Sequence, residues 1–255
     1  VCIMIPVLHI EDYNYNLPDE RIAKYPLERR DMSKLLVYKD GEIDSYVFSE
    51  LPDMIPAESM MVFNDTKVVP ARLFFRRETG AHIEIFCLEP QSPSDYVTNF
   101  ASTQSCVWKC VIGNSKRWKG DVLKFDVDGG ELSEMERTAR LLSKDGQTGN
   151  VEFAWKGGSP FSKVLELCGQ VPIPPYLNRD TESIDLERYQ TLYAHIRGSV
   201  AAPTAGLHFT DDVLGRIRAK GVDMETICLH VGAGTFLPVK SSLIGEHSMH
   251  REPFV

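Results

Sequence analysis

The chain has 255 residues, of which 43% are hydrophobic and 25% charged, which is typical of a soluble globular protein with one or two domains. Its formal net charge of −8 excludes a protein coated in basic charge for general nucleic-acid binding, although a local basic surface is compatible with it. No apolar run reaches the roughly 20 residues of a membrane-spanning helix, so we expect no membrane contact, and the apolar start lacks the flanks of a signal peptide.

The first sixty residues are predicted to form strands and turns. The segments KLLVY and SYVF flank the turn KDGEID, which indicates a β-hairpin. A further short strand, MMVFND, ends in the polar residues Asn64, Asp65 and Thr66. This region therefore supplies short strands but no long helix.

Residues 71–154 have the pattern of an all-β unit. Turn signals such as ETG, DGG and KDG separate six short segments rich in strand-forming residues: ARLFFRR, HIEIFCLE, SCVWKCVIG, VLKFDVDG, ARLLSKDG and NVEFAW. Short strands at regular spacing, without a long helix, predict a small antiparallel β-barrel.

Helices are predicted again after residue 155. The segment SPFSKVLELCGQ should begin at a serine cap and end at Gly169, and DLERYQTLYAHI is a second helical candidate. A third helix should run from its cap Thr210 to its stop Gly221, before a strand that ends near His230. We therefore predict an α/β fold in which a discontinuous α/β domain, residues 1–70 and 155–255, carries an inserted β-barrel domain, residues 71–154.

The six cysteines are spread along the chain, and only Cys106 and Cys110 are close in sequence. A zinc site would need a second pair at ligand spacing, which is absent, and the segment EHSMH lacks the H-E-x-x-H pattern. We therefore predict no bound metal and two buried thiols on one face of a strand. Scattered free thiols indicate a reducing compartment, most simply the cytoplasm.

Two segments, TAGLHFT and LHVGAGTF, each place a histidine in a bend of small residues. The helix after the first bend would direct its N-terminal dipole toward it, and glycine in the second lets a ligand approach the main chain. Each histidine is either a hydrogen-bonded structural residue or a proton-transfer group near neutral pH. The residues of interest are Thr204, Gly206 and His208 in the first bend and His230, Gly232, Gly234 and Thr235 in the second.

Charged residues supply two further candidates. The segment NSKRWKG sets Lys116, Arg117 and Lys119 around Trp118, a mixture that can pair with phosphate and stack on bases, or else form an ordinary solvated turn. The segment FNDTKVVPAR contains Asp65 and Arg72, with a side-chain-capped turn as the alternative interpretation.

Several of these segments also carry a family resemblance. They are YNLPDERIAKYPLERRDMSKLLVY, VFNDTKVVPARL, PIPPYLNR, RYQTLYA, GSVAAPTAGLHFT, LHVGAGTFLPV and EHSMH. In this order they resemble the S-adenosylmethionine:tRNA ribosyltransferase-isomerase family of queuosine biosynthesis. The resemblance implies that the ribosyl part of S-adenosylmethionine is transferred to 7-aminomethyl-7-deazaguanine in tRNA and isomerised, giving epoxyqueuosine, adenine and methionine.

The resemblance further implies S-adenosylmethionine as co-substrate, no prosthetic group, and precursor-bearing tRNA as partner. For this reaction we hypothesise that His208 and His230 are the acid/base pair and that Lys116, Arg117 and Lys119 contact the tRNA. Substrate would then be bound by Asp65, Arg72, Thr204, Gly206, Gly232, Gly234 and Thr235.

The resemblance implies a barrel-like α/β domain with an inserted small antiparallel β-barrel, in agreement with the predicted organisation. Family members carry two further motifs, Gly-Thr-Thr-Ser-x-Arg and Asn-Phe-His-Leu-Pro, that this sequence lacks, so we expect the α/β domain to be incomplete here. Two other functions stay open: a tRNA-binding relative without transferase activity, and an S-adenosylmethionine enzyme that acts on a small molecule.

Overall fold

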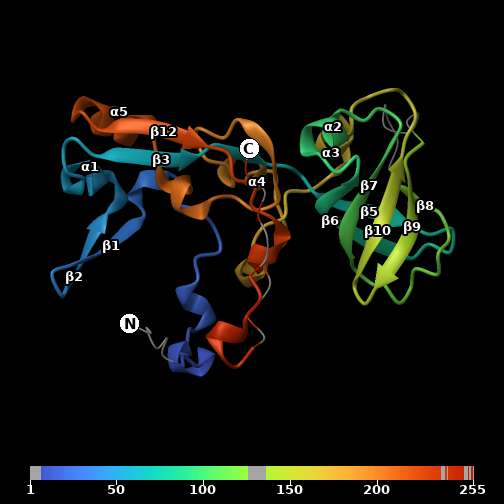
Figure 1. The fold of residues 1–255 in the computed structure, drawn as a ribbon, viewed down its shortest axis with the longest axis horizontal. Helices are drawn as coiled ribbons and strands as arrows, with labels where there is room; N and C mark the ends of the chain where they lie inside the picture. Colours follow the sequence, from blue (N-terminus) through green and yellow to red (C-terminus); the bar gives the residue numbers. More distant parts are fainter. Residues whose placement is uncertain are drawn as a thin grey trace, which may run out of the picture.

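The computed structural model describes residues 7–125, 136–236, 239, 241–249, 252 and 254. A β-barrel occupies one end of the long axis, and a mixed α/β part occupies the other (Figure 1). No helix in these ranges is long and apolar enough to cross a membrane.

The barrel is closed and antiparallel, with the strand order β10-β7-β6-β5-β8-β9. This confirms the all-β interpretation of residues 71–154, although part of the predicted strand VLKFDVDG lies outside the described residues. A short helix between β6 and β7, α2 (Tyr96–Ala101), was not predicted. The strands are β5 (Arg72–Arg76), β6 (His82–Ser92), β7 (Ser105–Ile112), β8 (Leu123–Phe125), β9 (Thr138–Asp145) and β10 (Thr148–Ala154).

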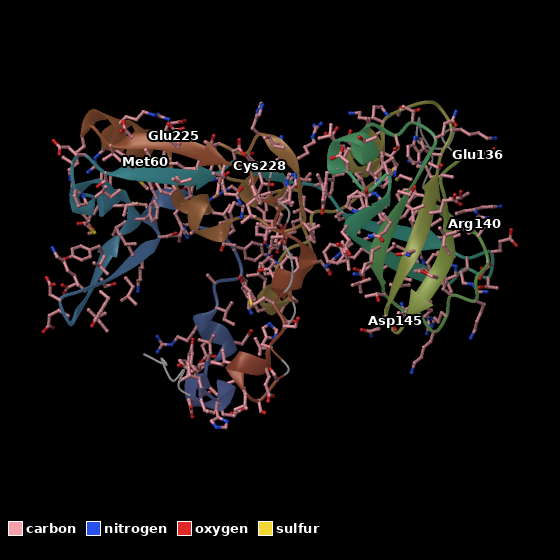
Figure 2. All side chains as sticks on the ribbon, viewed as in Figure 1. Met60, Glu136, Arg140, Asp145, Glu225 and Cys228 are labelled. Atoms are coloured by element: carbon pink, nitrogen blue, oxygen red, sulfur yellow. The ribbon has the colours of Figure 1, made fainter. Side chains whose placement is uncertain are left out.

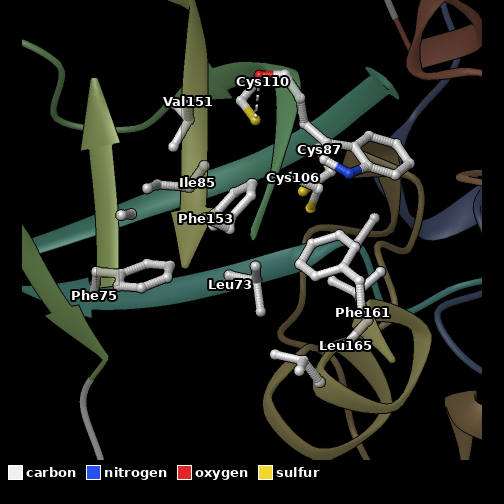
Figure 3. Close-up of a cluster of buried hydrophobic side chains, with 14 of the residues drawn as sticks. Leu73, Phe75, Ile85, Cys87, Cys106, Cys110, Val151, Phe153, Phe161 and Leu165 are labelled. Carbon is white, nitrogen blue, oxygen red and sulfur yellow. Dashed lines mark hydrogen bonds between the residues drawn. The ribbon is translucent and has the colours of Figure 1, made fainter. Parts of the chain in front are cut away.

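Alternating residues of the strands fill the barrel, because successive side chains of a strand point to opposite faces. Cys106 and Cys110 both point inward from β7, next to Cys87 of β6, and all three are buried free thiols (Figure 3). Burial raises the pKa of Cys106 and Cys110 and keeps them protonated. The prediction of two buried thiols on one strand face is confirmed.

Helix α3 (Phe161–Cys168) follows the barrel and packs against it. Its side chains Phe161 and Leu165 belong to the same buried cluster as the barrel interior (Figure 3). The expected serine cap is wrong, because the N-cap is Pro160, which has no side-chain hydrogen bond. The helix ends at Gly169, as predicted.

The α/β part is built from two parallel strand pairs and one hairpin. Strand β3 (Met60–Asn64) pairs with β12 (Asp223–Ile227), and β4 (Thr66–Val68) pairs with β11 (Ile196–Ser199). Both β3 and β12 run toward the barrel, so their carboxyl ends lie in the middle of the molecule (Figure 1).

The predicted hairpin is present as β1 (Lys34–Lys39) and β2 (Glu42–Val47). Its two turn residues, Asp40 and Gly41, have φ of 53° and 90°, the left-handed conformation that a two-residue hairpin turn requires.

Helix α5 (Asp211–Ala219) forms the second core with α1 (Leu51–Met54). Its apolar side packs on Phe48, Phe63 and Phe209. The predicted cap is confirmed, because Thr210 Oγ1 accepts a hydrogen bond from the amide of Val213 at 3.3 Å.

The helix predicted over DLERYQTLYAHI is mostly wrong, because only α4 (Asp185–Arg188) forms. The side chain of Gln190 instead bonds both backbone groups of Val68, at 3.0 and 2.8 Å. Pairing with β4 therefore overrides local helix propensity, and Ile196 already begins β11. The 3-10 helices are η1 (Ile10–Tyr13), η2 (Asp19–Arg21), η3 (Arg30–Met32), η4 (Phe48–Glu50), η6 (Pro175–Leu177), η7 (Thr204–His208), η8 (Ala233–Phe236) and η9 (Ile244–Glu246).

Candidate functional site

His230 lies just beyond the carboxyl end of β12, where the sequence predicts it, and only 2% of it is exposed. Its Nδ1 is 2.9 Å from Thr66 Oγ1, which is 2.7 Å from Ser199 Oγ. Ser199 Oγ accepts a hydrogen bond from the Val231 amide at 2.8 Å. A chain of two hydroxyls, one from β4 and one from β11, therefore fixes the imidazole.

Gly198 of β11 makes room for this imidazole. A Cβ atom at Gly198 would overlap Nδ1, Cε1 and Nε2 of His230 at nearly equal distances. A point equally close to these three atoms lies over the face of the ring, so the backbone of β11 covers that face. Only glycine leaves this space free.

The inserted barrel also reaches the imidazole. The ring of Tyr96, on helix α2, lies 5.0 Å from the His230 ring, centroid to centroid, at an interplanar angle of 42°. Burial raises the pKa of Tyr96, and the nearby carboxylates of Glu89 and Glu252 add to this effect. Elements from both parts of the molecule thus meet at His230.

A carboxylate accompanies the histidine. Burial lowers the pKa of His230 from its ordinary value of 6.5, and the negative charge of Asp65 partly opposes this shift. Asp65 Oδ1 is buried and has no hydrogen-bond partner among the described residues. A neutral imidazole beside a carboxylate with a vacant acceptor can receive a proton and attract a cation.

Cys228 belongs to the same cluster, and Figure 2 shows it between the outer α/β elements and the barrel. Its Sγ is 3.8 Å from Nδ1 of His230. Burial raises the pKa of this thiol, and the charge of Asp65 raises it further. Cys228 is therefore a protonated thiol and a poor nucleophile.

Asn64 fastens the segment that carries His230. Its Nδ2 donates to the carbonyl of Leu229 at 2.8 Å, and its Oδ1 accepts from the amides of Leu229 and Thr66 at 3.0 and 3.2 Å. Farther along, the Gly232 amide donates to Glu252 Oε2 at 2.6 Å. These bonds hold the main chain on both sides of the imidazole.

The first histidine-bearing bend has different surroundings. His208 is half-buried in η7, and its ring lies 5.3 Å from that of Phe48 in the second core. His208 and His230 share no hydrogen bond or ring contact in the described structure. A Cβ at Gly206 would overlap the Tyr193 hydroxyl, so protein already fills the space beside this glycine.

The remaining small-residue candidates lie near the surface. Thr204 and Thr235 are exposed, and Gly234 is half-buried in η8. The same turn is anchored on the barrel by Phe236, whose ring is 6.4 Å from that of Phe86. These residues border the His230 segment without contacting the imidazole.

Arg72 is on the barrel rather than in the His230 cluster. It forms an ion pair with Glu84 at 3.0 Å and lies over the ring of Phe86 at 5.8 Å. Neither contact involves Asp65, the other candidate of the same segment.

Lys116, Arg117 and Lys119 are all exposed on the barrel and are available to an anionic partner. The expectation that Trp118 stacks on a base is wrong. Its indole is 3% exposed, belongs to the barrel core, and donates to the carbonyl of Asp121 at 2.7 Å.

Within the described ranges, no three His, Cys, Asp or Glu side chains are grouped as metal ligands. His250 of the EHSMH segment lies outside those ranges.

Sequence analysis alone missed four contributors to the His230 cluster: Tyr96, Gly198, Ser199 and Cys228. Gly198 and Ser199 stand in the same small-residue stretch as the first bend, so their sequence signal was assigned to that bend. Tyr96 is 134 positions away from His230 and has no local signal at all.

Comparisons with known proteins agree on one family. A family model described as queuosine biosynthesis protein matches residues 10–255. The S-adenosylmethionine:tRNA ribosyltransferase-isomerase of Trichlorobacter lovleyi is 39% identical over 248 residues, or 96% of this chain and 67% of the relative. The enzyme of that name from Francisella philomiragia is 38% identical over 247 residues, with the same coverage.

A solved structure, the S-adenosylmethionine tRNA ribosyltransferase of Thermotoga maritima, is 25% identical, with a TM-score of 0.32. The alignment covers 86% of this chain and 58% of that one. The present chain thus spans about two thirds of the length of these curated relatives and less of the solved one.

Proposed function

This chain belongs to the queuosine biosynthesis protein family, and on that premise we propose that it is an S-adenosylmethionine-dependent tRNA ribosyltransferase-isomerase. It transfers the ribosyl moiety of S-adenosylmethionine to 7-aminomethyl-7-deazaguanine in tRNA and isomerises it, giving epoxyqueuosine, adenine and methionine. S-adenosylmethionine is a co-substrate, and no prosthetic group takes part.

The observation that carries this proposal is a buried histidine with a lowered pKa beside the half-buried Asp65, whose Oδ1 is itself buried. The sulfonium of S-adenosylmethionine acidifies the ribose 5′ carbon, so the reaction needs a base at that carbon. His230 takes this proton, because its imidazole is neutral near pH 7. The negative charge of Asp65 would attract the cationic sulfonium.

The proposed role requires the imidazole tautomer that carries its proton on Nδ1, and the hydroxyl chain is compatible with it. In this tautomer Nδ1–H of His230 donates to Thr66 Oγ1, and the Thr66 hydroxyl donates to Ser199 Oγ. Ser199 Oγ has two lone pairs, so it can also accept from the Val231 amide. This arrangement leaves the lone pair on Nε2, where it can accept the ribose proton.

Departure of adenine needs a proton donor, and His208 is our candidate for it. His208 lies in the other small-residue bend, and its lack of contact with His230 suits two groups that act on different parts of one substrate. We assign Thr204, Gly206, Gly232, Gly234 and Thr235 to binding of the donor, Gly206 through its backbone because Tyr193 fills the space beside it. Arg72 remains a candidate for substrate binding, and Lys116, Arg117 and Lys119 present cations to the tRNA from the barrel.

The proposal extends to domain organisation and compartment. Residues 1–70 and 155–255 form a discontinuous, barrel-like α/β domain, and residues 71–154 form the insert. The parallel pairs β3–β12 and β4–β11 support this division, because each joins segments on either side of the insert. The free cysteines support a cytoplasmic location.

The test is single-turnover release of adenine from S-adenosylmethionine in the presence of precursor-bearing tRNA. His230→Ala should lower the rate by about 10²–10⁴-fold, the usual contribution of a general base, and His208→Ala should also lower it. The exposed His82, on the barrel, provides the matched control His82→Ala, which should keep the wild-type rate.

Other outcomes would contradict this function. Near-normal rates in both variants would exclude the acid/base pair. A wild-type chain that binds the tRNA but releases no adenine would be a tRNA-binding relative. Adenine release that is indifferent to tRNA would indicate a small-molecule enzyme.

A further inference from the structure

A cavity of about 140 Å³ lies between helix α3 and the β4–β11 pair. One water molecule needs about 10–15 Å³ on this scale, so the cavity has room for a group of several heavy atoms. Its polar lining comes from Lys67, Ser162, Glu166, Gln190 and Arg197.

The β4–β11 pair places two cations side by side at this cavity. Lys67 and Arg197 are register partners in adjacent parallel strands, which are about 4.8 Å apart in a sheet. Thr66, the residue before Lys67, bonds His230, and successive side chains of a strand alternate in direction. The two cations therefore project from the side of the pair that faces away from the imidazole.

The charges around the cavity do not cancel. Glu166 is the one acid among its described lining residues, and it already pairs with Arg197 and, at 3.5 Å, with Lys163. The side chain of Lys67 forms no hydrogen bond or ion pair with any described residue. The side-chain amide of Gln190 is already hydrogen-bonded to the backbone of Val68. An unpaired positive charge is thus left at the cavity.

Helix α3 adds to this positive potential. Ser162 lies in its first turn, and the N-cap Pro160 supplies no side-chain hydrogen bond to the amides there. The amides of Phe161 and Lys163 already donate to the carbonyls of Ser102 and Pro160, so among the described residues the Ser162 amide is the first-turn donor left for an anion.

We infer that this cavity binds a phosphate group, held by Lys67 and Arg197 and by the first turn of α3. The inference rests on the proposed function, because that function makes a backbone phosphate of the tRNA the group that occupies the cavity. A small substrate held beside His230 lies on the other side of the strand pair, so its own anionic groups are not the ligand here. A polyanion that spans the barrel and the α/β part can reach both sites.

The experiment measures tRNA affinity against salt concentration for the full chain and for Lys67→Gln. Each phosphate contact contributes about 0.7–0.9 to the slope of log K against log salt. We expect the slope of Lys67→Gln to be less negative by about this amount, and affinity to fall equally for tRNA with and without the modified base. Lys39→Gln, at the exposed tip of the β1–β2 hairpin, should leave the slope unchanged. Equal slopes for wild type and Lys67→Gln would overturn the inference.

A second arm uses inorganic phosphate alone and follows the backbone amide signals of Lys67 and Ser162 by NMR. Saturable shifts in the wild type that are lost in Lys67→Gln support the phosphate site, and their absence overturns it. Saturable shifts together with an unchanged tRNA slope would show a site for free phosphate and overturn the assignment to tRNA.

The two arms also separate this inference from the proposed function. If the wild type releases no adenine but Lys67→Gln still changes the salt slope, the chemistry fails and the phosphate site stands. If adenine release is normal and the slopes are equal, the chemistry stands and the phosphate site fails.

Discussion

Gly198 shows how one missing side chain can define a site. Its backbone covers the face of the His230 ring, and Thr66 and Ser199 hold one edge of that ring. Protein interiors are packed too tightly to absorb an extra methyl group at such a point without displacement. The imidazole can occupy its place only because residue 198 is glycine.

Gly198→Ala should therefore displace the imidazole and break its bond to Thr66. We expect the rate of adenine release to fall by more than about tenfold, and the free energy of unfolding to fall by about 1–3 kcal/mol through overpacking. Single-turnover assays and urea denaturation would measure these effects.

Gly215 provides a matched control for this substitution. It lies inside helix α5, and a Cβ there would meet no atom within 4 Å. Gly215→Ala should stabilise the chain by about 0.5–1 kcal/mol, since glycine is a poor helix former, and should leave the rate alone. A Gly198→Ala variant that behaved like Gly215→Ala would contradict the placement of the ring.

At the residue scale, the sequence identifies the residues whose signal is local. His230 stood out because it follows a predicted strand and precedes glycines. Thr66 was noticed only as part of a polar strand end, and Tyr96 was not noticed, because their roles depend on strand pairing and on the docking of the insert. The pairing of His208 with His230 stays a prediction, since no contact joins the two rings in the described structure.

Among the elements, helix α5 follows most directly from its own sequence. Thr210 caps it, acidic residues occupy its first turn, and basic residues occupy its last. Thr210 Oγ1 also donates to Oδ2 of the buried Asp31 at 3.3 Å. The cap therefore joins the helix to an N-terminal segment as well as satisfying a helix amide.

Thr210→Ala should lower the free energy of unfolding by about 1 kcal/mol, because the amide of Val213 loses its partner. Urea denaturation followed by circular dichroism would measure the loss. Thr210→Ser keeps the hydroxyl and should recover most of the stability. Equal destabilisation by alanine and serine would instead assign the effect to the lost methyl group.

Elements that depend on distant partners were harder to predict. In the barrel, β5, β7 and β10 alternate between buried and more exposed residues, so their pattern was visible in the sequence. The stretch after Arg188 has helix-like composition, yet Gln190 binds the edge of β4 and Ile196 begins a strand. A contact across more than a hundred positions there outweighs a local preference.

For the whole molecule, the insert and the α/β part form a shared site rather than two separate units. Helix α3 is part of the barrel core, and Val200, just past β11, belongs to the same buried cluster. Phe236 packs on Phe86, and Tyr96 packs on His230. The composition and turn pattern of residues 71–154 predicted a barrel but gave no indication that the barrel completes the His230 environment.

Substitutions of Tyr96 test whether the insert contributes to the environment of His230. Tyr96→Ala should remove the ring that packs on His230 and admit water to the imidazole. Because burial keeps the imidazole neutral, we expect the rate of adenine release to fall by about tenfold or more. In the same variant the pKa of His230, followed by NMR, should rise toward its ordinary value of 6.5.

Tyr96→Phe keeps the aromatic contact and should retain both the rate and the lowered pKa of His230. Val97→Ala, on the same helix but 70% exposed, controls for general damage to α2 and should behave as the wild type. If Tyr96→Ala left the His230 pKa unchanged, the insert would be only a neighbour of the site. A raised pKa with an intact barrel would instead mean that residues 71–154 help to set the protonation state of His230 across the junction between the two parts.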